Sequence, residues 1–412
     1  MAELAERAAA ALARREHAGL LRDRAARVLE GAPGARVRVG GRELWSFASN
    51  GYLGLSTHPR VVGALVHEAE RTGASASASR QVAGNLVAHH ELEHALAALK
   101  GAEQALVFSS GYAANVGVLG ALGRALDVAL GDDDRAPPLF VSDALNHASI
   151  IDGCRLSGAE VAIYPHGDAA AAEALLARAR VERRRALVVT ESRFSMDGDV
   201  APLAALAAAC RAHGAALVVD EAHATGVDGE GRGLVHALGL ADHVDVVVGT
   251  LGKALGAHGA FVAGARATVR YLENAARPFV FSTGLPAHLA AAALAALTVL
   301  REERPDRALA QNVATLGMLL AERGVDDAVA PGATGPILPV RVGAPARALA
   351  LAHHLTEHQV LAVAIRPPTV PEGTARVRLS VRADHPPKAL VALADALASA
   401  RAAGLLPIGA SS

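Results

Sequence analysis

A lysine and an aspartate, each following an apolar run, carry the chemistry that this sequence suggests most clearly. Asp220 closes the run Leu217–Val219, and Lys253 lies further along in a glycine-flanked segment after Val246–Gly249. A pyridoxal phosphate enzyme needs such a pair. The reason is that a carboxylate keeps the ring nitrogen of the cofactor protonated while a lysine amine holds its aldehyde as a Schiff base. The pair therefore predicts a pyridoxal phosphate site.

Two further segments could complete such a site. Ser109–Asn115 follows a predicted strand and opens a predicted helix, so its backbone N–H groups could cradle a phosphate. The alternative is an ordinary strand-to-helix turn with a serine cap. His147 also follows a strand, where parallel sheets gather ligands, and its ring could stack on a flat cofactor or simply be a polar loop residue.

The tetrapeptide Asp220–His223 also reads as Asp-Glu-Ala-His, a signature of nucleotide-hydrolysing motors. Such proteins need a Gly-x-x-x-x-Gly-Lys-[Ser/Thr] loop. The only Gly-Lys pair here is followed by Ala254, and Val247 stands where the first glycine should be. The motor interpretation is therefore rejected.

A second competing motif, His90-Glu91-Leu92-Glu93-His94, fits the zinc protease pattern His-Glu-x-x-His on a predicted helix. Two imidazoles four residues apart share one helix face, so zinc is geometrically feasible. The chain shows no later zinc-ligand pattern, however, which favours a solvated helix face. We expect no metal, and a zinc metalloprotease remains only a remote alternative.

Composition narrows the remaining function classes. The chain has 412 residues, 52% apolar and 20% charged, and its 40 basic against 41 acidic residues give a net charge of −1. This balance predicts no general affinity for nucleic acid or an anionic membrane. The apolar stretch Leu289–Leu300 is too short to cross a bilayer, and the N-terminus lacks a secretory signal. Two isolated cysteines, Cys154 and Cys210, form no disulfide framework and suit a reducing cytoplasm.

The order of predicted elements indicates an α/β fold. Residues 2–30 read as one helix and 35–47 as a hairpin turning at Gly40-Gly41. Short apolar strands then alternate with helices, which predicts a mostly parallel central sheet with helices on both faces. The predicted strands are 105–108, 139–142, 161–164, 186–190, 215–220, 244–249 and 261–263. One intervening helix opens at Pro202 and stops at Gly214.

A smaller α+β domain should follow. Its predicted elements are a helix over 287–304, strands over 337–342 and 376–381, and a helix over 345–358. We therefore expect an N-terminal arm over 1–57, a large cofactor-binding domain over 58–288 and a small C-terminal domain over 289–412.

The chain resembles the α-oxoamine synthases, which are fold-type I pyridoxal phosphate enzymes. The matching segments are 49–55, 110–115, 146–149, 190–191, 194–199, 220–226, 249–253 and 281–284. Within the family, Ile365–Pro371 followed by Gly373–Leu379 resembles the members that act in biotin biosynthesis. The chain departs from the family pattern at Gly51, where others carry an acidic residue, and at Ala74–Ser79, where others carry glycines. The Cβ atoms of Ala74–Ser79 would narrow the space for the acyl chain or CoA.

The resemblance implies a role for each cofactor residue. Lys253 would be the Schiff-base lysine, Asp220 the partner of the ring nitrogen, and His147 the stacking residue. His223 and Ser195 would flank the phenolic oxygen of the ring. The phosphate would be served by Gly111, Tyr112 and Thr250, and by Ser282 and Thr283 across the interface of a homodimer.

The resemblance also implies a substrate site and a reaction. Asn50 and Arg366 would hold the amino acid carboxylate, as suits a bidentate guanidinium, with Thr369 near the acyl thioester. The family's acyl-binding arginine aligns with either Leu21 or Arg22. The implied reaction condenses L-alanine with pimeloyl-CoA, or the same acyl group on a carrier protein, with release of CO2.

Three alternatives stay open at this stage. A sibling synthase using glycine or serine with another acyl-CoA would share all of the cofactor residues. An aminotransferase would share Asp220 and Lys253. A non-catalytic homologue would keep the fold, although the presence of Lys253 argues against it.

Overall fold

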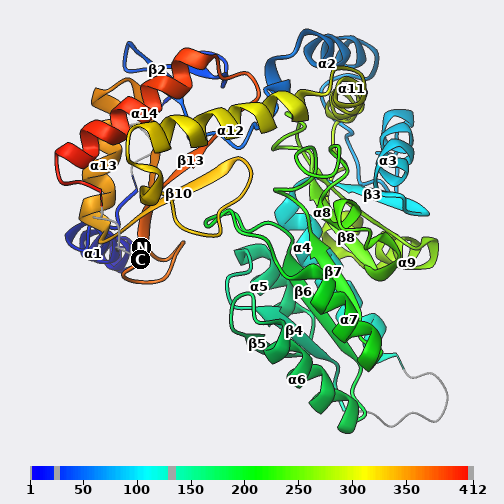
Figure 1. Cartoon of the computed structure of the whole chain (residues 1–412). Coiled ribbons are helices and arrows are strands. Elements are labelled where there is room, and N and C mark those ends of the chain that lie inside the picture. The colour runs from blue at the N-terminus through cyan, green and yellow to red at the C-terminus, as the bar shows by residue number, and fades with distance from the viewer. Residues whose placement is uncertain (1, 23–27, 129–135, 407–412) are drawn as a thin grey trace. The chain divides into compact units, whose positions relative to one another are not determined.

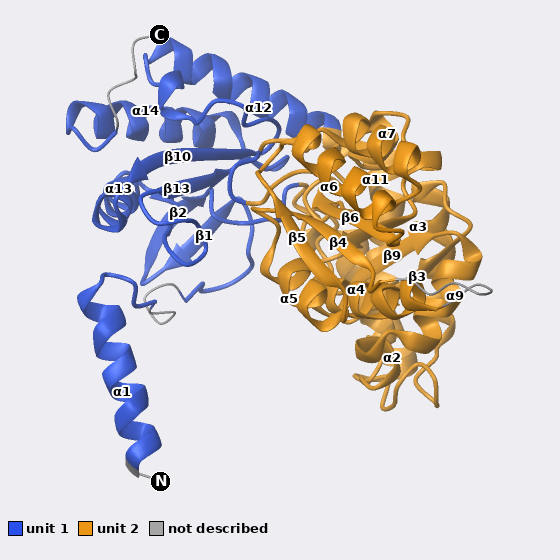
Figure 2. Cartoon of the chain, turned by 90° about the horizontal axis from the view of Figure 1, so that it is seen from below, with its two compact units in different colours: residues 1–52, 196–198, 307–412 blue, residues 53–195, 199–306 orange. Residues whose placement is uncertain are grey.

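The computed structural model describes residues 2–22, 28–128 and 136–406, which form two compact units (Figure 2). Unit 1 falls within residues 1–52, 196–198 and 307–412, and unit 2 within residues 53–195 and 199–306. This division differs from the expected one. The N-terminal hairpin groups with the C-terminal residues because its second strand pairs with a strand of that region, and the helix over 287–303 groups with the large unit.

Unit 2 is built on a seven-stranded sheet with the order β3-β9-β8-β7-β6-β4-β5 (Figure 1). The strands are β3 (Gln104–Phe108), β4 (Leu139–Asp143), β5 (Glu160–Tyr164), β6 (Ala186–Glu191), β7 (Ala216–Asp220), β8 (Val246–Thr250) and β9 (Ala260–Gly264). Every strand predicted in this region is present. The pairs from β8 to β5 are parallel, and β9 alone runs antiparallel to its neighbours β8 and β3. The central sheet is therefore mostly parallel, as the continuous apolar runs predict.

Helices cover both faces of this sheet (Figure 1). Side chains of α6 and α7 form one core cluster with Leu217 and Val219 of β7. Side chains of α4, α5 and α9 form another cluster with Val218, the residue between those two in the sequence. Alternate residues of one strand thus serve opposite faces. The helices are α2 (Pro59–Thr72), α3 (Val87–Lys100), α4 (Gly111–Asp127), α5 (Ala148–Leu156), α6 (Ala169–Val181), α7 (Leu203–His213), α8 (Leu234–Ala237), α9 (Arg266–Ala275), α10 (Arg277–Val280) and α11 (Ala287–Glu303), with 3-10 turns at Leu55–Thr57 and Ala241–His243.

The two cysteines lie in these separate clusters, Cys154 in one and Cys210 in the other, and both are free. Burial raises the pKa of each thiol to about 12. A disulfide between them is excluded because the sheet separates them.

Unit 1 contains two three-stranded sheets. The first has the order β1-β2-β11, and its hairpin turns at Gly40-Gly41, both with positive φ, as predicted. The second has the order β10-β13-β12 and is antiparallel throughout. The strands are β1 (Arg36–Val39), β2 (Arg42–Ser46), β10 (Ile337–Gly343), β11 (Val360–Leu361), β12 (Val363–Ile365) and β13 (Ala375–Ser380). The helices are α1 (Ala2–His17), α12 (Pro305–Glu322), α13 (Pro345–Glu357) and α14 (Pro387–Ala402), with a 3-10 turn at Asp326–Ala328.

The first helix is shorter than predicted. It ends at His17, so the expectation of one helix over 2–30 is wrong for the described residues after that point; residues 23–27 lie outside the described structure. Gly19 has φ 65°, and the N–H of Leu20 donates to the carbonyl of Arg15 at 2.7 Å. This is the glycine-capped ending of many helices, so Gly19 is the stop signal that the prediction overlooked.

No helix in the described ranges is long and apolar enough to cross a membrane.

Candidate active site

Lys253 lies in the turn that follows β8, at the carboxyl end of the parallel strands of unit 2. Its Nζ is 2.8 Å from Nε2 of His223, which is itself buried and follows β7. The turn is shaped by close packing, because a Cβ on Gly249 would lie 2.4 Å from the ring of Phe261 and one on Gly256 would lie 2.2 Å from Ser56 N. The glycines on either side of the lysine therefore allow the backbone to pack this closely.

Asp220 is the last residue of the neighbouring strand β7. Its side chain is buried, and its carboxylate accepts two hydrogen bonds: Oδ2 from Asn115 Nδ2 at 2.7 Å and Oδ1 from the N–H of Ala222 at 2.8 Å. Hydrogen bonds of this kind stabilise the ionised carboxylate. The structure thus brings the predicted aspartate and lysine to the same edge of one sheet.

Glu191 is a site residue that the sequence-based reasoning did not select. It ends β6 directly opposite Asp220 in the register of the two strands, and it is buried. Burial, followed by the charge of Asp220, raises the pKa of Glu191 to about 8, while Lys253 opposes the shift. Within the described structure its Oε1 atom has no hydrogen-bond partner. A buried polar atom without a partner calls for an explanation, and a bound polar ligand would supply one.

His147 caps the N-terminus of α5 after β4. Its Nδ1 accepts a hydrogen bond from the N–H of Ser149 at 3.2 Å and lies 2.7 Å from Ser149 Oγ. Desolvation by surrounding protein lowers the pKa of His147, an effect that Lys253 reinforces and Asp220 opposes. A neutral imidazole close to Asp220 and Lys253 suits the predicted stacking role.

The anion cradle is predicted at the N-terminus of α4. Ser110 is the N-cap, and its Oγ accepts the N–H of Ala113 at 3.2 Å, as an ordinary serine cap does. Gly111 follows as the first helical residue, and a Cβ there would meet nothing within 4 Å. Space beside exposed N–H groups at a helix N-terminus suits a phosphate. Tyr112 is exposed, and its hydroxyl donates to Asp152.

The other predicted phosphate residues are placed as follows. Thr250 ends β8, where its Oγ1 donates to the carbonyl of Gly259 at 3.1 Å and accepts the N–H of Gly252 at 3.2 Å. Ser282 and Thr283 line a small cavity of unit 2 together with Ser109, the residue just before the α4 cap. Their reach across a dimer interface stays a prediction.

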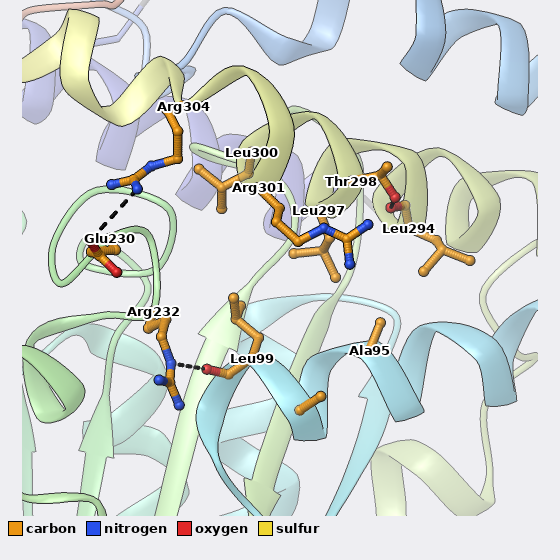
Figure 3. Close-up of a pocket in the computed structure, with 11 residues that line it drawn as sticks. Ala95, Leu99, Glu230, Arg232, Leu294, Leu297, Thr298, Leu300, Arg301 and Arg304 are labelled. Carbon is orange, nitrogen blue, oxygen red and sulfur yellow. Dashed lines mark hydrogen bonds and ion pairs between the residues drawn. The ribbon is translucent and has the colours of Figure 1, made fainter.

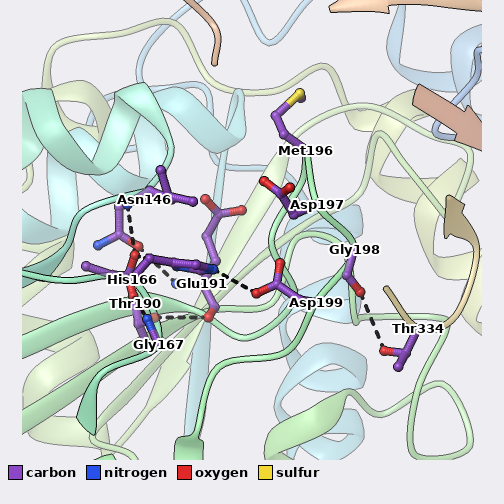
Figure 4. A network of polar contacts seen from close by, with 12 residues as sticks. Asn146, His166, Gly167, Thr190, Glu191, Met196, Asp197, Gly198, Asp199 and Thr334 are labelled. Atoms are coloured by element: carbon purple, nitrogen blue, oxygen red, sulfur yellow. Dashed lines mark hydrogen bonds and ion pairs between the residues drawn. The ribbon is translucent and has the colours of Figure 1, made fainter. Parts of the chain in front are cut away.

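Ser195 is half-buried in the loop after β6, and a charged network holds this loop (Figure 4). His166 Nε2 lies 2.7 Å from Asp199 Oδ2, and its Nδ1 lies 2.9 Å from Asp143 Oδ1. These two carboxylates raise the pKa of His166 to about 10. The imidazolium therefore ties the far end of the Ser195 loop to the end of β4.

A buried ion pair supports the segment after β7. Lys100 Nζ, at the end of α3, donates to Glu221 Oε2 at 2.7 Å, Thr225 Oγ1 at 2.8 Å and the carbonyl of Arg232 at 2.6 Å. Glu221 Oε1 accepts the N–H of Val235 at 2.8 Å. All three N–H donors of the ammonium have an acceptor. Lys100 therefore holds Glu221, the residue directly after Asp220 and two before His223.

The predicted substrate residues belong to unit 1. Arg22 donates to Thr369 Oγ1 at 2.6 Å, so these two are brought together. Arg366 is buried, and its guanidinium donates to the backbone carbonyls of Gly19 and Leu21. The expected carboxylate clamp is thus engaged with the N-terminal segment.

Asn50 contacts a different arginine. Arg378 donates to Asn50 Oδ1 at 2.8 Å and to Tyr52 Oη at 2.9 Å. Arg376 is instead paired with Asp197. The residue after Asp197, Gly198, accepts the N–H of Thr334 at its carbonyl, at 3.0 Å. Arg378 is therefore the arginine placed beside Asn50.

A cavity of about 440 Å³ opens elsewhere in unit 2, between α3 and α11 (Figure 3). Leu294, Leu297 and Leu300 form one wall. Its arginines are engaged, since Arg232 donates to the carbonyl of Leu99 and Arg304 pairs with Asp306 and Glu230. None of the predicted site residues lines it, so the cavity is separate from the candidate active site.

His90 and His94 of the zinc-protease pattern line one pocket together with Glu93, which pairs with Arg80 and accepts the N–H of Val107. Among the described residues, no group of three or more His, Cys, Asp or Glu side chains is arranged to hold a metal ion.

Comparison with known proteins agrees with this geometry. The sequence model of the aminotransferase class I and II family matches residues 42–397. An 8-amino-7-oxononanoate synthase from Anaeromyxobacter dehalogenans (strain 2CP-1) is 52% identical over 86% of this chain and 85% of its own length. One from Geobacter sulfurreducens is 46% identical over 88% and 90%. A solved serine palmitoyltransferase from S. paucimobilis, with bound PLP–myriocin aldimine, has a TM-score of 0.87 at 29% identity and covers 96% of this chain and 97% of its own.

The chain therefore belongs to the aminotransferase class I and II family and, within it, to the α-oxoamine synthases.

Proposed function

We propose that this protein condenses L-alanine with a pimeloyl thioester, carried by CoA or a carrier protein, to give 8-amino-7-oxononanoate, CO2 and the free thiol in biotin biosynthesis. The observation that carries the proposal is the placement of Lys253 beside His223 and next to Asp220, at the carboxyl edge of one sheet. The similarity of most of the chain to 8-amino-7-oxononanoate synthases, at 42–52% identity, supports this choice of substrates.

The site residues fit pyridoxal 5′-phosphate. The open N-terminus of α4 at Gly111 suits the phosphate, Asp220 suits the ring nitrogen, and Lys253 is the amine for the aldehyde. When bound, the cofactor supplies an electron sink for the bonds at the amino acid Cα. The unsatisfied Oε1 of buried Glu191, at the same edge of the sheet, supports a polar ligand there.

Lys253 is the general base in this proposal. Its amine takes the proton from Cα of L-alanine and later returns a proton to the product. His223 lies 2.8 Å from that amine, where its ring nitrogen can accept an N–H hydrogen bond and hold Nζ in one direction. The carboxylate of Asp220, held by two donors, stabilises positive charge facing it.

For the substrate carboxylate we propose Asn50 with Arg366, and Arg378 as the competing arginine because it already contacts Asn50. Thr369 and Arg22 form a hydrogen-bonded pair that we propose for the acyl substrate. We also expect a homodimer, with Ser282 and Thr283 serving the phosphate of the partner site, and a reducing cytoplasm as the working compartment of two buried free thiols.

A substrate panel tests the proposal. Purified protein with pyridoxal phosphate is given L-alanine, glycine or L-serine against pimeloyl-CoA or palmitoyl-CoA, and thiol release and product mass are followed. We expect product only with L-alanine and pimeloyl-CoA. Preference for L-serine with palmitoyl-CoA would replace the proposal with the activity named for the solved neighbour. Conversion of the cofactor to its amine form with a keto acid would indicate an aminotransferase.

A further inference from the structure

Asn115 links Asp220 to the rest of the site. It lies on α4, is buried, and uses one amide nitrogen for two contacts: Nδ2 donates to Asp220 Oδ2 at 2.7 Å and to Ser149 Oγ at 3.0 Å. Ser149 is also buried and lies in the first turn of α5, two residues after His147. Two residues that carry no charge thus connect the predicted ring-nitrogen partner with the predicted stacking histidine.

The directions of these hydrogen bonds are determined by chemistry. The carboxylate of Asp220 only accepts, so the amide of Asn115 must turn its nitrogen, and not its oxygen, toward Oδ2. The second hydrogen of Nδ2 then points to Ser149 Oγ, which accepts it. The hydroxyl hydrogen of Ser149 is therefore available for His147 Nδ1, 2.7 Å away.

A second donor meets the same histidine atom. The backbone N–H of Ser149 points at His147 Nδ1 from 3.2 Å. With two donors converging on it, Nδ1 acts as an acceptor, and a neutral ring must carry its hydrogen on Nε2. The charged groups that act on this ring are Asp220, which favours the imidazolium, and Lys253, which disfavours it.

We propose that Asn115 and Ser149 are positioning residues, forming one directed hydrogen-bond chain that orients the carboxylate of Asp220 and holds the ring of His147 with Nδ1 as acceptor and its hydrogen on Nε2. This inference rests on the proposed function for the roles of Asp220 and His147. Ser149 acts on the histidine only, whereas Asn115 acts on the aspartate and, through Ser149, on the histidine. The two can therefore be separated by substitution.

Ser149→Ala tests the histidine end. Long-range proton–nitrogen correlation spectra of the histidine rings are recorded on the cofactor-free protein over a range of pH, with His147→Gln used for assignment. Loss of one hydrogen bond to Nδ1 should raise the protonation constant of His147 about fivefold and mix its two tautomers. The matched control is Ser157→Ala, at the other end of α5, which removes an equally buried hydroxyl bonded to the carbonyl of Cys154 at 2.6 Å. It should leave His147 unchanged.

Asn115→Ala tests the aspartate end. The cofactor-free variant is titrated with pyridoxal phosphate alone and followed by visible absorbance, with circular dichroism to check the fold. Removing a hydrogen bond to a charged carboxylate should weaken binding at least about tenfold, whereas Ser149→Ala should weaken it less than Asn115→Ala does. Binding of Asn115→Ala within about twofold of the parent protein would overturn this half of the proposal.

The two levels of the account fail differently. An unchanged tautomer and protonation constant of His147 in Ser149→Ala would overturn the positioning role, even in a protein that condenses L-alanine with pimeloyl-CoA. A protein that makes no such product, while His147 responds as expected, would overturn the proposed function and leave the hydrogen-bond chain standing.

Discussion

Replacing Lys100 by methionine should destabilise the protein strongly, although Lys100 contacts no proposed ligand group. Its side chain is 3% exposed and that of Glu221 is 0% exposed, so the substitution leaves a buried carboxylate without its counter-charge. Two further acceptors, Thr225 Oγ1 and the carbonyl of Arg232, lose their donor at the same time. Removing one partner of a buried pair costs about 3–5 kcal/mol, so we expect a loss of that size in the free energy of unfolding.

Urea unfolding followed by far-ultraviolet circular dichroism measures this loss. The matched control is Lys388→Met, because Lys388 is exposed and its Nζ lies over the ring of Trp45, 5.4 Å from the ring centroid. A contact of that kind is worth about 0.5–1 kcal/mol. Adding Glu221→Gln to Lys100→Met removes the stranded charge and should recover part of the loss. Equal midpoints for Lys100→Met and Lys388→Met would refute the assigned role of the buried pair.

Three further predictions follow from the site. Asp220→Asn keeps the shape but loses the charge, so the rate of Cα proton exchange in L-alanine should fall about 100- to 1,000-fold, or about 2.7–4 kcal/mol; an unaltered exchange rate would remove Asp220 from its role. The pKa of His166 is raised from 6.5 to about 10. The stability that the charged ring gives to the folded protein is therefore complete below pH 6.5 and is lost as pH rises through about 10. His166→Gln should abolish that part of the pH dependence of the melting temperature, and an identical profile in both proteins would count against the network. Arg366→Lys and Arg378→Lys show which arginine binds the carboxylate of L-alanine. That arginine is the one whose variant has the larger increase in the apparent KM for L-alanine while the cofactor absorbance stays normal.

The fold was largely predictable because buried parallel strands are continuous apolar runs, and all seven strands of the large sheet were located this way. The antiparallel direction of β9 could not be predicted, because a buried strand has the same apolar sequence pattern in either direction. The end of α1 was missed because Gly19 was taken as part of a helical pattern.

The candidate site divides in the same way. Asp220 and Lys253 could be predicted because their chemistry is visible in the sequence around them. Asn115, Ser149 and Glu191 could not, because their importance comes from contacts between residues far apart in the chain. The partners of Arg366, two backbone carbonyls, carry no side-chain signal at all.

The most direct test of the central claim is the mass of the product formed from L-alanine and pimeloyl-CoA by the purified, pyridoxal phosphate-loaded protein. We predict 8-amino-7-oxononanoate with one CO2 and one free thiol per turnover, and none from Lys253→Ala under the same conditions. No product from this pair, or equal product from Lys253→Ala, would contradict the account.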